Sequence, residues 1–195
     1  MNRYVREYTM KKSERPLIDK SGLLELKLNG CGALFVEGDA ALGKSEAVRA
    51  LIARHPEAAV YQVDLKFVTN ELDSRAIHEE ILSAESRPER PVWFVFENMD
   101  RNTPECVISN IARLAEDGEE DIKVIVISRD EPPSSLMKLL WYEQMDVITA
   151  EDFILDLEEI SSLIEQNDSR LQAGRFSALD RLRTVRRISG SVGMP

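Results

Sequence analysis

The chain has 195 residues, of which 43% are hydrophobic and 31% are charged, and its formal net charge is −10 at pH 7. This composition suits one globular core with a small appendage, and the acidic balance disfavours a broad nucleic-acid-binding surface, which needs clustered Lys and Arg. The two cysteines and two histidines are isolated and lack the spacing of metal ligands. Neither a signal-peptide core nor an apolar run of roughly 18 residues is found, so we expect a cytoplasmic protein without a membrane partner.

Five apolar runs, rich in β-branched and aromatic residues, predict strands at residues 33–37, 58–65, 91–97, 122–128 and 146–149. The third and fourth runs are apolar almost without interruption, which is typical of parallel strands covered on both faces. Apolar residues at helical spacing predict helices between them, at residues 45–54, 74–84, 104–115 and 134–142. This alternation predicts an α/β core, with a five-stranded, mainly parallel sheet flanked by helices.

The strand pattern stops near residue 150. Beyond it, Leu157, Ile160 and Ile164 have helical spacing, and so have Leu179 and Leu182. We therefore predict a core at residues 1–150 and the start of a helical lid subdomain at residues 151–195.

The segment GDAALGKS fits the P-loop pattern Gly-x-x-x-x-Gly-Lys-Ser and stands between a predicted strand and a predicted helix. In such a loop, successive backbone N–H groups and the helix N-terminus surround a phosphate. Lys44 is expected to reach the β- and γ-phosphates, and the Ser45 hydroxyl to bind Mg²⁺. The alternative is a glycine turn before a helix, with no ligand. A working loop would bind nucleotide through Gly38, Asp39, Ala40, Ala41, Leu42, Gly43, Lys44, Ser45 and Glu46.

Three acids beside this loop oppose the binding of a polyanion. Glu37 ends a predicted strand and Asp39 occupies a position whose side chain can face solvent. Glu46 is harder to reconcile, because a carboxylate directly after Ser45 repels nucleotide unless it turns outward. We expect binding to survive in weakened form.

The segment VWFVFENMD predicts a strand that ends in acidic and amide residues. Glu97 is the candidate ligand of Mg²⁺, and Asn98 cannot accept a proton, which leaves Asp100 as the candidate for activating water. Glu97 and Asp100 are therefore the candidate catalytic residues, of at most a slow ATPase. The alternative is an apolar strand with an incidental acid at its end.

Arg129 directly follows the fourth predicted strand. An arginine at this strand end would lie beside the γ-phosphate and could sense which nucleotide is bound. The competing interpretation is a loop arginine paired with Asp130 or Glu131.

Together these motifs resemble the nucleotide-binding module of STAND-class P-loop ATPases, which are AAA+-like, and more narrowly the large ATP-binding transcriptional regulators of the MalT/LuxR type. The segment from Ser128 to Ile164 carries the most specific part of the resemblance, and the terminal SGSVGMP resembles the family's Gly-x-Pro element, whose proline (here Pro195) usually lies against adenine. The chain departs from the family at four positions, namely Asp39, Ala41, Glu46 and Glu97, where Pro, Gly, a hydroxyl residue and Asp are usual.

The resemblance implies an ATP/ADP-binding switch with Mg²⁺ as its metal, which self-associates when ATP-bound and contacts DNA only through a domain absent from this chain. Two alternatives remain open: a stand-alone P-loop NTPase or kinase that acts on a small molecule, and a degenerate interaction module that binds no nucleotide.

Overall fold

The computed structural model describes residues 5–7, 19–68, 70–85, 91–117, 121–154 and 159–161. The chain divides into two compact units: Met1–Lys12 with Asp19–Ile154, and Ser13–Ile18 with Leu155–Pro195. The first unit ends four residues after the predicted boundary at residue 150, because Phe153 is buried in its core. The helices predicted for the lid, and Pro195, fall almost wholly outside the described residues.

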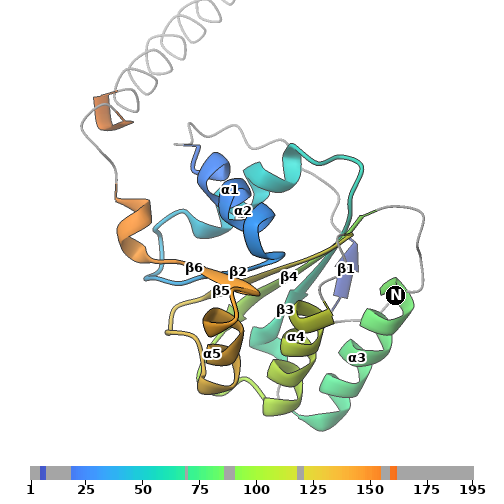
Figure 1. Ribbon diagram of the computed structural model, residues 1–195. Coiled ribbons are helices and arrows are strands. Elements are labelled where there is room, and N and C mark those ends of the chain that lie inside the picture. The colour runs from blue at the N-terminus through green and yellow to red at the C-terminus, as the bar shows by residue number, and fades with distance from the viewer. Residues whose placement is uncertain are drawn as a thin grey trace, which may run out of the picture. The chain divides into compact units, whose positions relative to one another are not determined.

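A six-stranded sheet forms the first unit (Figure 1), in the order β1-β3-β4-β5-β2-β6. Its strands are β1 (Val5–Glu7), β2 (Ala33–Val36), β3 (Ala59–Asp64), β4 (Val92–Met99), β5 (Ile122–Ser128) and β6 (Met145–Ile148). Strands β2 to β6 pair in parallel, as the sequence predicts. The edge strand β1 pairs antiparallel with β3 and was not predicted, since three residues are too few to show a periodic pattern.

Five α-helices and two 3₁₀ helices accompany the strands in the described residues of the first unit. They are α1 (Ser21–Cys31), α2 (Lys44–Ala53), η1 (Leu65–Phe67), α3 (Glu71–Glu85), α4 (Glu105–Asp117), α5 (Ser134–Trp141) and η2 (Ala150–Phe153). Helices α2 to α5 lie where the sequence predicts them, and α1 is an addition. Figure 1 shows α1 and α2 on one face of the sheet, and α3, α4 and α5 on the other.

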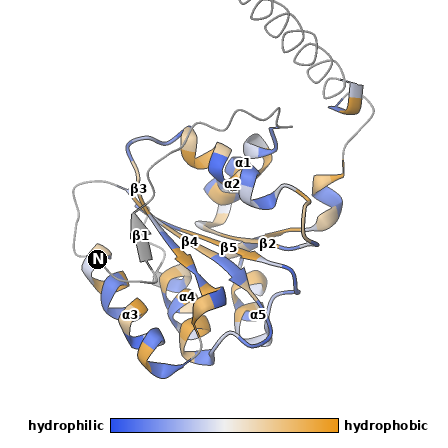
Figure 2. Cartoon of the chain, turned by 180° about the vertical axis from the view of Figure 1, so that it is seen from behind, coloured by the Kyte–Doolittle hydropathy of each residue, from blue (hydrophilic) through white to orange (hydrophobic). Residues whose placement is uncertain are grey.

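The core consists of two apolar layers, one on each face of the sheet. Alternate strand residues point to opposite faces, so Leu34 and Val36 pack with α1 and α2, whereas Phe35 packs in the layer beneath α3, α4 and α5. All four residues of β2 are buried, and burying each larger apolar side chain among them, Leu34, Phe35 and Val36, stabilises the fold by about 1.5–3 kcal/mol. In Figure 2 the hydrophobic strands run between helices whose outer faces are hydrophilic.

Strand β2 lies between β5 and β6, both of which follow it in the chain. The chain therefore changes direction across the sheet at β2, and in open α/β sheets ligands bind at such a point, outside the carboxyl ends of the strands. The loop after β2 emerges there. None of the helices that the structure describes combines the length and apolarity that a bilayer crossing requires.

Candidate nucleotide-binding site

The loop between β2 and α2 has the backbone conformation that its glycines allow. Glu37 N–H donates to the Ile148 carbonyl oxygen at 2.8 Å, and the loop then turns through positive φ angles at Gly38 (136°), Ala41 (70°) and Gly43 (84°). A Cβ on Gly38 would lie 2.7 Å from a methyl carbon of Leu42 and 3.3 Å from the Ala150 Cα, and together with the φ of 136° these contacts favour glycine at this position. Gly43 is the N-cap of α2, which points the helix N-terminus at the loop.

Lys44 closes the loop from its far end. Its side chain is only 8% exposed, and its Nζ donates to the carbonyl oxygens of Gly38 and, at 2.7 Å, Asp39. An ammonium group carries three N–H donors, so one remains for a ligand. Burial, followed by the nearby charge of Arg129, lowers the pKa of Lys44, and Asp39 opposes this shift. An anion beside Nζ would therefore stabilise the protonated form.

A cavity of about 270 Å³ opens over the loop. Six of its lining residues come from the loop Gly38–Ser45 and a seventh directly follows it, and the others come from the ends of two neighbouring strands. They are Ala40, Ala41, Leu42, Gly43, Lys44, Ser45 and Glu46, with Asn98 from β4 and Ile127, Ser128 and Arg129 from the end of β5 and the residue after it. The fold thus brings together most of the predicted nucleotide-binding residues around one hollow.

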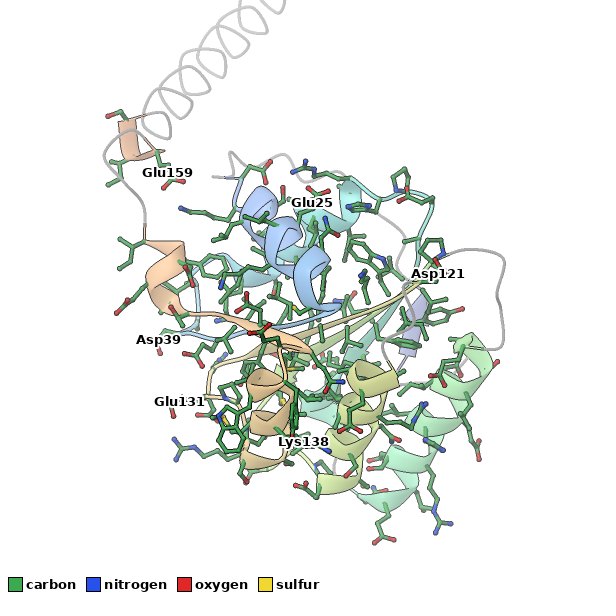
Figure 3. The ribbon with its side chains drawn as sticks, viewed as in Figure 1. Glu25, Asp39, Asp121, Glu131, Lys138 and Glu159 are labelled. Atoms are coloured by element: carbon green, nitrogen blue, oxygen red, sulfur yellow. The ribbon has the colours of Figure 1, made fainter. Side chains whose placement is uncertain are left out.

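The three acids beside the loop are disposed differently from one another. Glu46 lines the cavity but is ion-paired with Arg49 on the same helix. Asp39 is exposed, and Figure 3 shows Asp39 and Glu131 on the same side of the molecule. Glu37 is partly buried, and its pKa is raised first by that burial and then by the negative charge of Glu131. The acid expected to interfere most, Glu46, has a cationic partner.

Strand β4 carries a bulge where the sequence predicted its end. The register with β5 shifts between Phe96 and Met99, and Asn98 has a φ of 59°. Bulges re-aim side chains, often near binding sites, and this one sets Asn98 in the cavity lining. Glu97 is partly buried and aligned with Asp64 of β3. Among the described residues that line the cavity, β4 contributes Asn98 and not Glu97, so metal binding by Glu97 stays a prediction.

Asp100 lies outside the cavity over the loop. Its carboxylate accepts a hydrogen bond from the Asn102 backbone N–H at 2.8 Å, and its own N–H donates to the Thr103 hydroxyl at 3.1 Å. Asp100 therefore shapes the turn before α4, and it lines a second cavity of about 450 Å³. Asp100 directly follows the last residue of β4 and is not among the described residues that line the cavity with Lys44, so its part in activating water stays a prediction.

Arg129 lines both cavities, as does the buried Ser128. Asp130, one of the partners considered for Arg129, instead contacts Arg101 at 3.4 Å. Ser128 Oγ donates to the Met99 carbonyl oxygen at 3.1 Å and accepts from the Asp130 N–H at 2.9 Å, which fixes the turn that carries Arg129. Sequence reasoning gave no role to Ser128, although a hydroxyl residue at the end of an apolar strand was a usable signal.

Five parallel strands, with a glycine loop joining a central strand to the helix beside it, make the α/β fold of P-loop NTPases. No protein-family model matches the chain, and no curated protein does. Among solved structures it is similar to one chain of the HORMA:CdnC:Trip13 complex of E. coli MS115-1, with 18% identity and a TM-score of 0.44 over 65% of this chain and 46% of that one. It is also similar to PCH-2 of C. elegans, with 13% identity and a TM-score of 0.47 over 67% of this chain and 39% of that one.

The chain spans less than half the length of either of these two structures. With TM-scores below 0.5, the two likenesses carry no conclusion about the activity of this chain. They do not confirm the narrower resemblance to MalT/LuxR-type regulators.

Proposed function

We propose that this module binds Mg-ATP and Mg-ADP at the loop Gly38–Ser45 and hydrolyses ATP slowly, as a nucleotide-dependent switch. The observation that carries the proposal is the placement of Lys44. Two loop carbonyl oxygens hold its Nζ beside the cavity, with one N–H donor left over. A buried ammonium in that position supports binding of a phosphate chain, because an anion offsets its desolvation.

The residues around the cavity fit a magnesium-bound polyphosphate. Ser45 is the second residue of α2, directly after Lys44, and lines the cavity, so its hydroxyl would hold Mg²⁺, with Glu97 as the candidate second ligand. The metal would neutralise charge on the β- and γ-phosphate oxygens. The pairing of Glu46 with Arg49 supports binding, since it offsets the carboxylate nearest to the expected phosphates.

Thermal unfolding with and without nucleotide tests the proposal. Mg-ATP or Mg-ADP at 100 times its dissociation constant is expected to add about 2.7 kcal/mol to the free energy of unfolding. Lys44→Ala should abolish this increment, whatever it does to the stability of the free protein. Lys66→Ala, which removes an exposed ammonium lying over the Phe67 ring, should leave the increment unchanged. Absence of any increment with the unmodified chain would instead favour a degenerate module that binds no nucleotide.

The role of the switch in a longer regulator rests on the sequence resemblance to MalT/LuxR-type proteins. On that basis we propose that Mg-ATP promotes self-association of this chain and that Mg-ADP does not. Sedimentation velocity in each nucleotide tests this, and identical profiles in both would contradict it. The second cavity, beside Arg129, favours one other candidate, a small-molecule kinase whose acceptor binds there. Transfer of labelled γ-phosphate to a compound other than water would support that candidate.

A further inference from the structure

Two side chains at the ends of the neighbouring strands β3 and β4 form a hydrogen bond close to the proposed nucleotide-binding site. Asn98 Nδ2 donates to Asp64 Oδ1 at 2.8 Å. Asp64 ends β3, where it is the N-cap of η1, and its carboxylate also accepts from the Lys66 backbone N–H at 3.3 Å. Asp64 is therefore held by its own strand end, and it holds Asn98 in turn.

This bond fixes which end of the Asn98 carboxamide is free. A carboxylate accepts hydrogen bonds and donates none, so the amide nitrogen must face Asp64 and the amide oxygen must face away. No other hydrogen bond to the Asn98 side chain is present in the described part of the chain. The bulge and the positive φ of Asn98 set this residue in the cavity lining. The cavity over the loop is thus offered an oriented acceptor, Asn98 Oδ1.

We propose that Asn98 Oδ1 orients the water that attacks the γ-phosphorus, and that Asp64 is the positioning residue that holds Asn98 in place. This inference rests on the proposed nucleotide binding. It has a carboxamide orient the water, whereas sequence reasoning considered Asp100 as the residue that would activate it. A carboxamide can orient an attacking water in P-loop proteins without accepting its proton.

In this step the water oxygen bonds to the γ-phosphorus while the bond from phosphorus to the β–γ bridging oxygen breaks. ADP leaves with that electron pair, and the water proton passes to an oxygen of the departing phosphate. No side chain takes the proton, which is consistent with the slow hydrolysis proposed above. Asp64 contacts neither water nor phosphate and acts only through Asn98.

Single-turnover hydrolysis of Mg-ATP by variants of the full chain tests the assignment. Asn98→Ala is expected to lower the rate about tenfold or more. Asp64→Ala should do nearly the same, whereas Asp64→Asn should retain most of the rate, because its amide oxygen still accepts from Asn98 Nδ2. Asn110→Ala, which removes a carboxamide bonded to His78 between α3 and α4, is the control and should not change the rate.

Exchanging the two residues gives a readout that a structural role cannot produce. The double variant Asp64→Asn/Asn98→Asp keeps the hydrogen bond with its polarity reversed and sets a carboxylate base in the cavity lining. We expect it to hydrolyse ATP about tenfold faster than the unmodified chain or more, with a new rise in rate as pH increases through the pKa of that carboxyl. The single variant Asn98→Asp should show a weaker gain, displaced to higher pH, because two facing carboxylates repel.

The increase in the free energy of unfolding on adding nucleotide reports binding, and it separates the failure of this inference from the failure of the proposed function. If nucleotide does not raise the free energy of unfolding of the unmodified chain, both the proposed function and this inference are overturned. If nucleotide raises the free energy of unfolding but the exchanged double variant hydrolyses ATP no faster, the assignment of Asn98 and Asp64 is overturned and nucleotide binding stands. The same holds if the unmodified chain turns over measurably and Asn98→Ala does not lower its rate.

Discussion

Glu46 is ion-paired with Arg49, three residues further along α2. Residues at this spacing are neighbours on a helix surface, and both side chains remain partly exposed, Arg49 by 39% and Glu46 by 37%. The pair therefore reduces, without removing, the negative potential that Glu46 adds to the cavity. The negative charge that Glu46 places beside the phosphate-binding loop is thus partly compensated by Arg49, one helical turn further on.

Removing either partner of this pair should change nucleotide affinity in opposite directions. Arg49→Ala is expected to raise the dissociation constant of Mg-ADP, and Glu46→Gln to lower it, each roughly two- to fivefold, since exposed pairs contribute about 0.2–1 kcal/mol. Isothermal titration calorimetry measures both. With Glu46→Gln already present, Arg49→Ala should have little further effect. An equal loss on adding Arg49→Ala to either background would mean that Arg49 acts independently of Glu46.

Ala41 has a φ of 70° in the loop, a conformation that costs an L-residue other than glycine about 1–2 kcal/mol, whereas its neighbour Ala40 has no positive φ. Ala41→Gly relieves this strain, and Ala40→Gly does not. Both variants gain similar freedom in the unfolded chain, so Ala41→Gly should exceed Ala40→Gly in free energy of unfolding by about 1–2 kcal/mol. Urea denaturation without nucleotide measures the difference. Equal values would show that Ala41 is unstrained in solution.

The strands and the loop could be predicted because their signals are local. Continuous apolar runs mark strands buried on both faces, and the positive φ of Gly38 favours glycine at that position of the loop. Helix α1 was missed because Leu26, amid its leucines, is 73% exposed and blurs the periodicity. The bulge at Asn98 also left no sequence signal, since it arises from the pairing of β4 with β5. Sequence reasoning set Asn98 aside because a carboxamide cannot accept a proton, which left Asp100 as the candidate for activating water.

Arg129 should distinguish ATP from ADP. It lines the cavity with Lys44, and Asp130 is paired with Arg101. Charge-assisted hydrogen bonds contribute about 1.5–3 kcal/mol, so Arg129→Ala should weaken Mg-ATP roughly ten- to a hundredfold while Mg-ADP changes little. Calorimetric titration with each nucleotide measures this. Arg75→Ala, which removes an exposed arginine on α3 away from both cavities, should alter neither affinity. An equal loss for both nucleotides would indicate a general charge effect and not sensing.

Glu37 should make the fold less stable as the pH rises. Its pKa is raised above the ordinary value of 4.5 by burial and, next, by Glu131, so the native state keeps this proton to a higher pH than the unfolded chain does. Where the native state binds more protons, the free energy of unfolding falls with increasing pH. Glu37→Gln removes this dependence.

The advantage of Glu37→Gln over the unmodified chain should be smallest near pH 4, grow as pH rises through the raised pKa, and then level off. Urea denaturation at a series of pH values measures it, and taking the difference between the two proteins cancels the other titrating groups. Glu131→Gln should have a smaller effect of the same sign, because burial, which it leaves in place, is the larger cause of the shift. If the difference in free energy of unfolding between the two proteins does not vary with pH, the Glu37 carboxylate is solvated in the folded protein and its pKa is not raised.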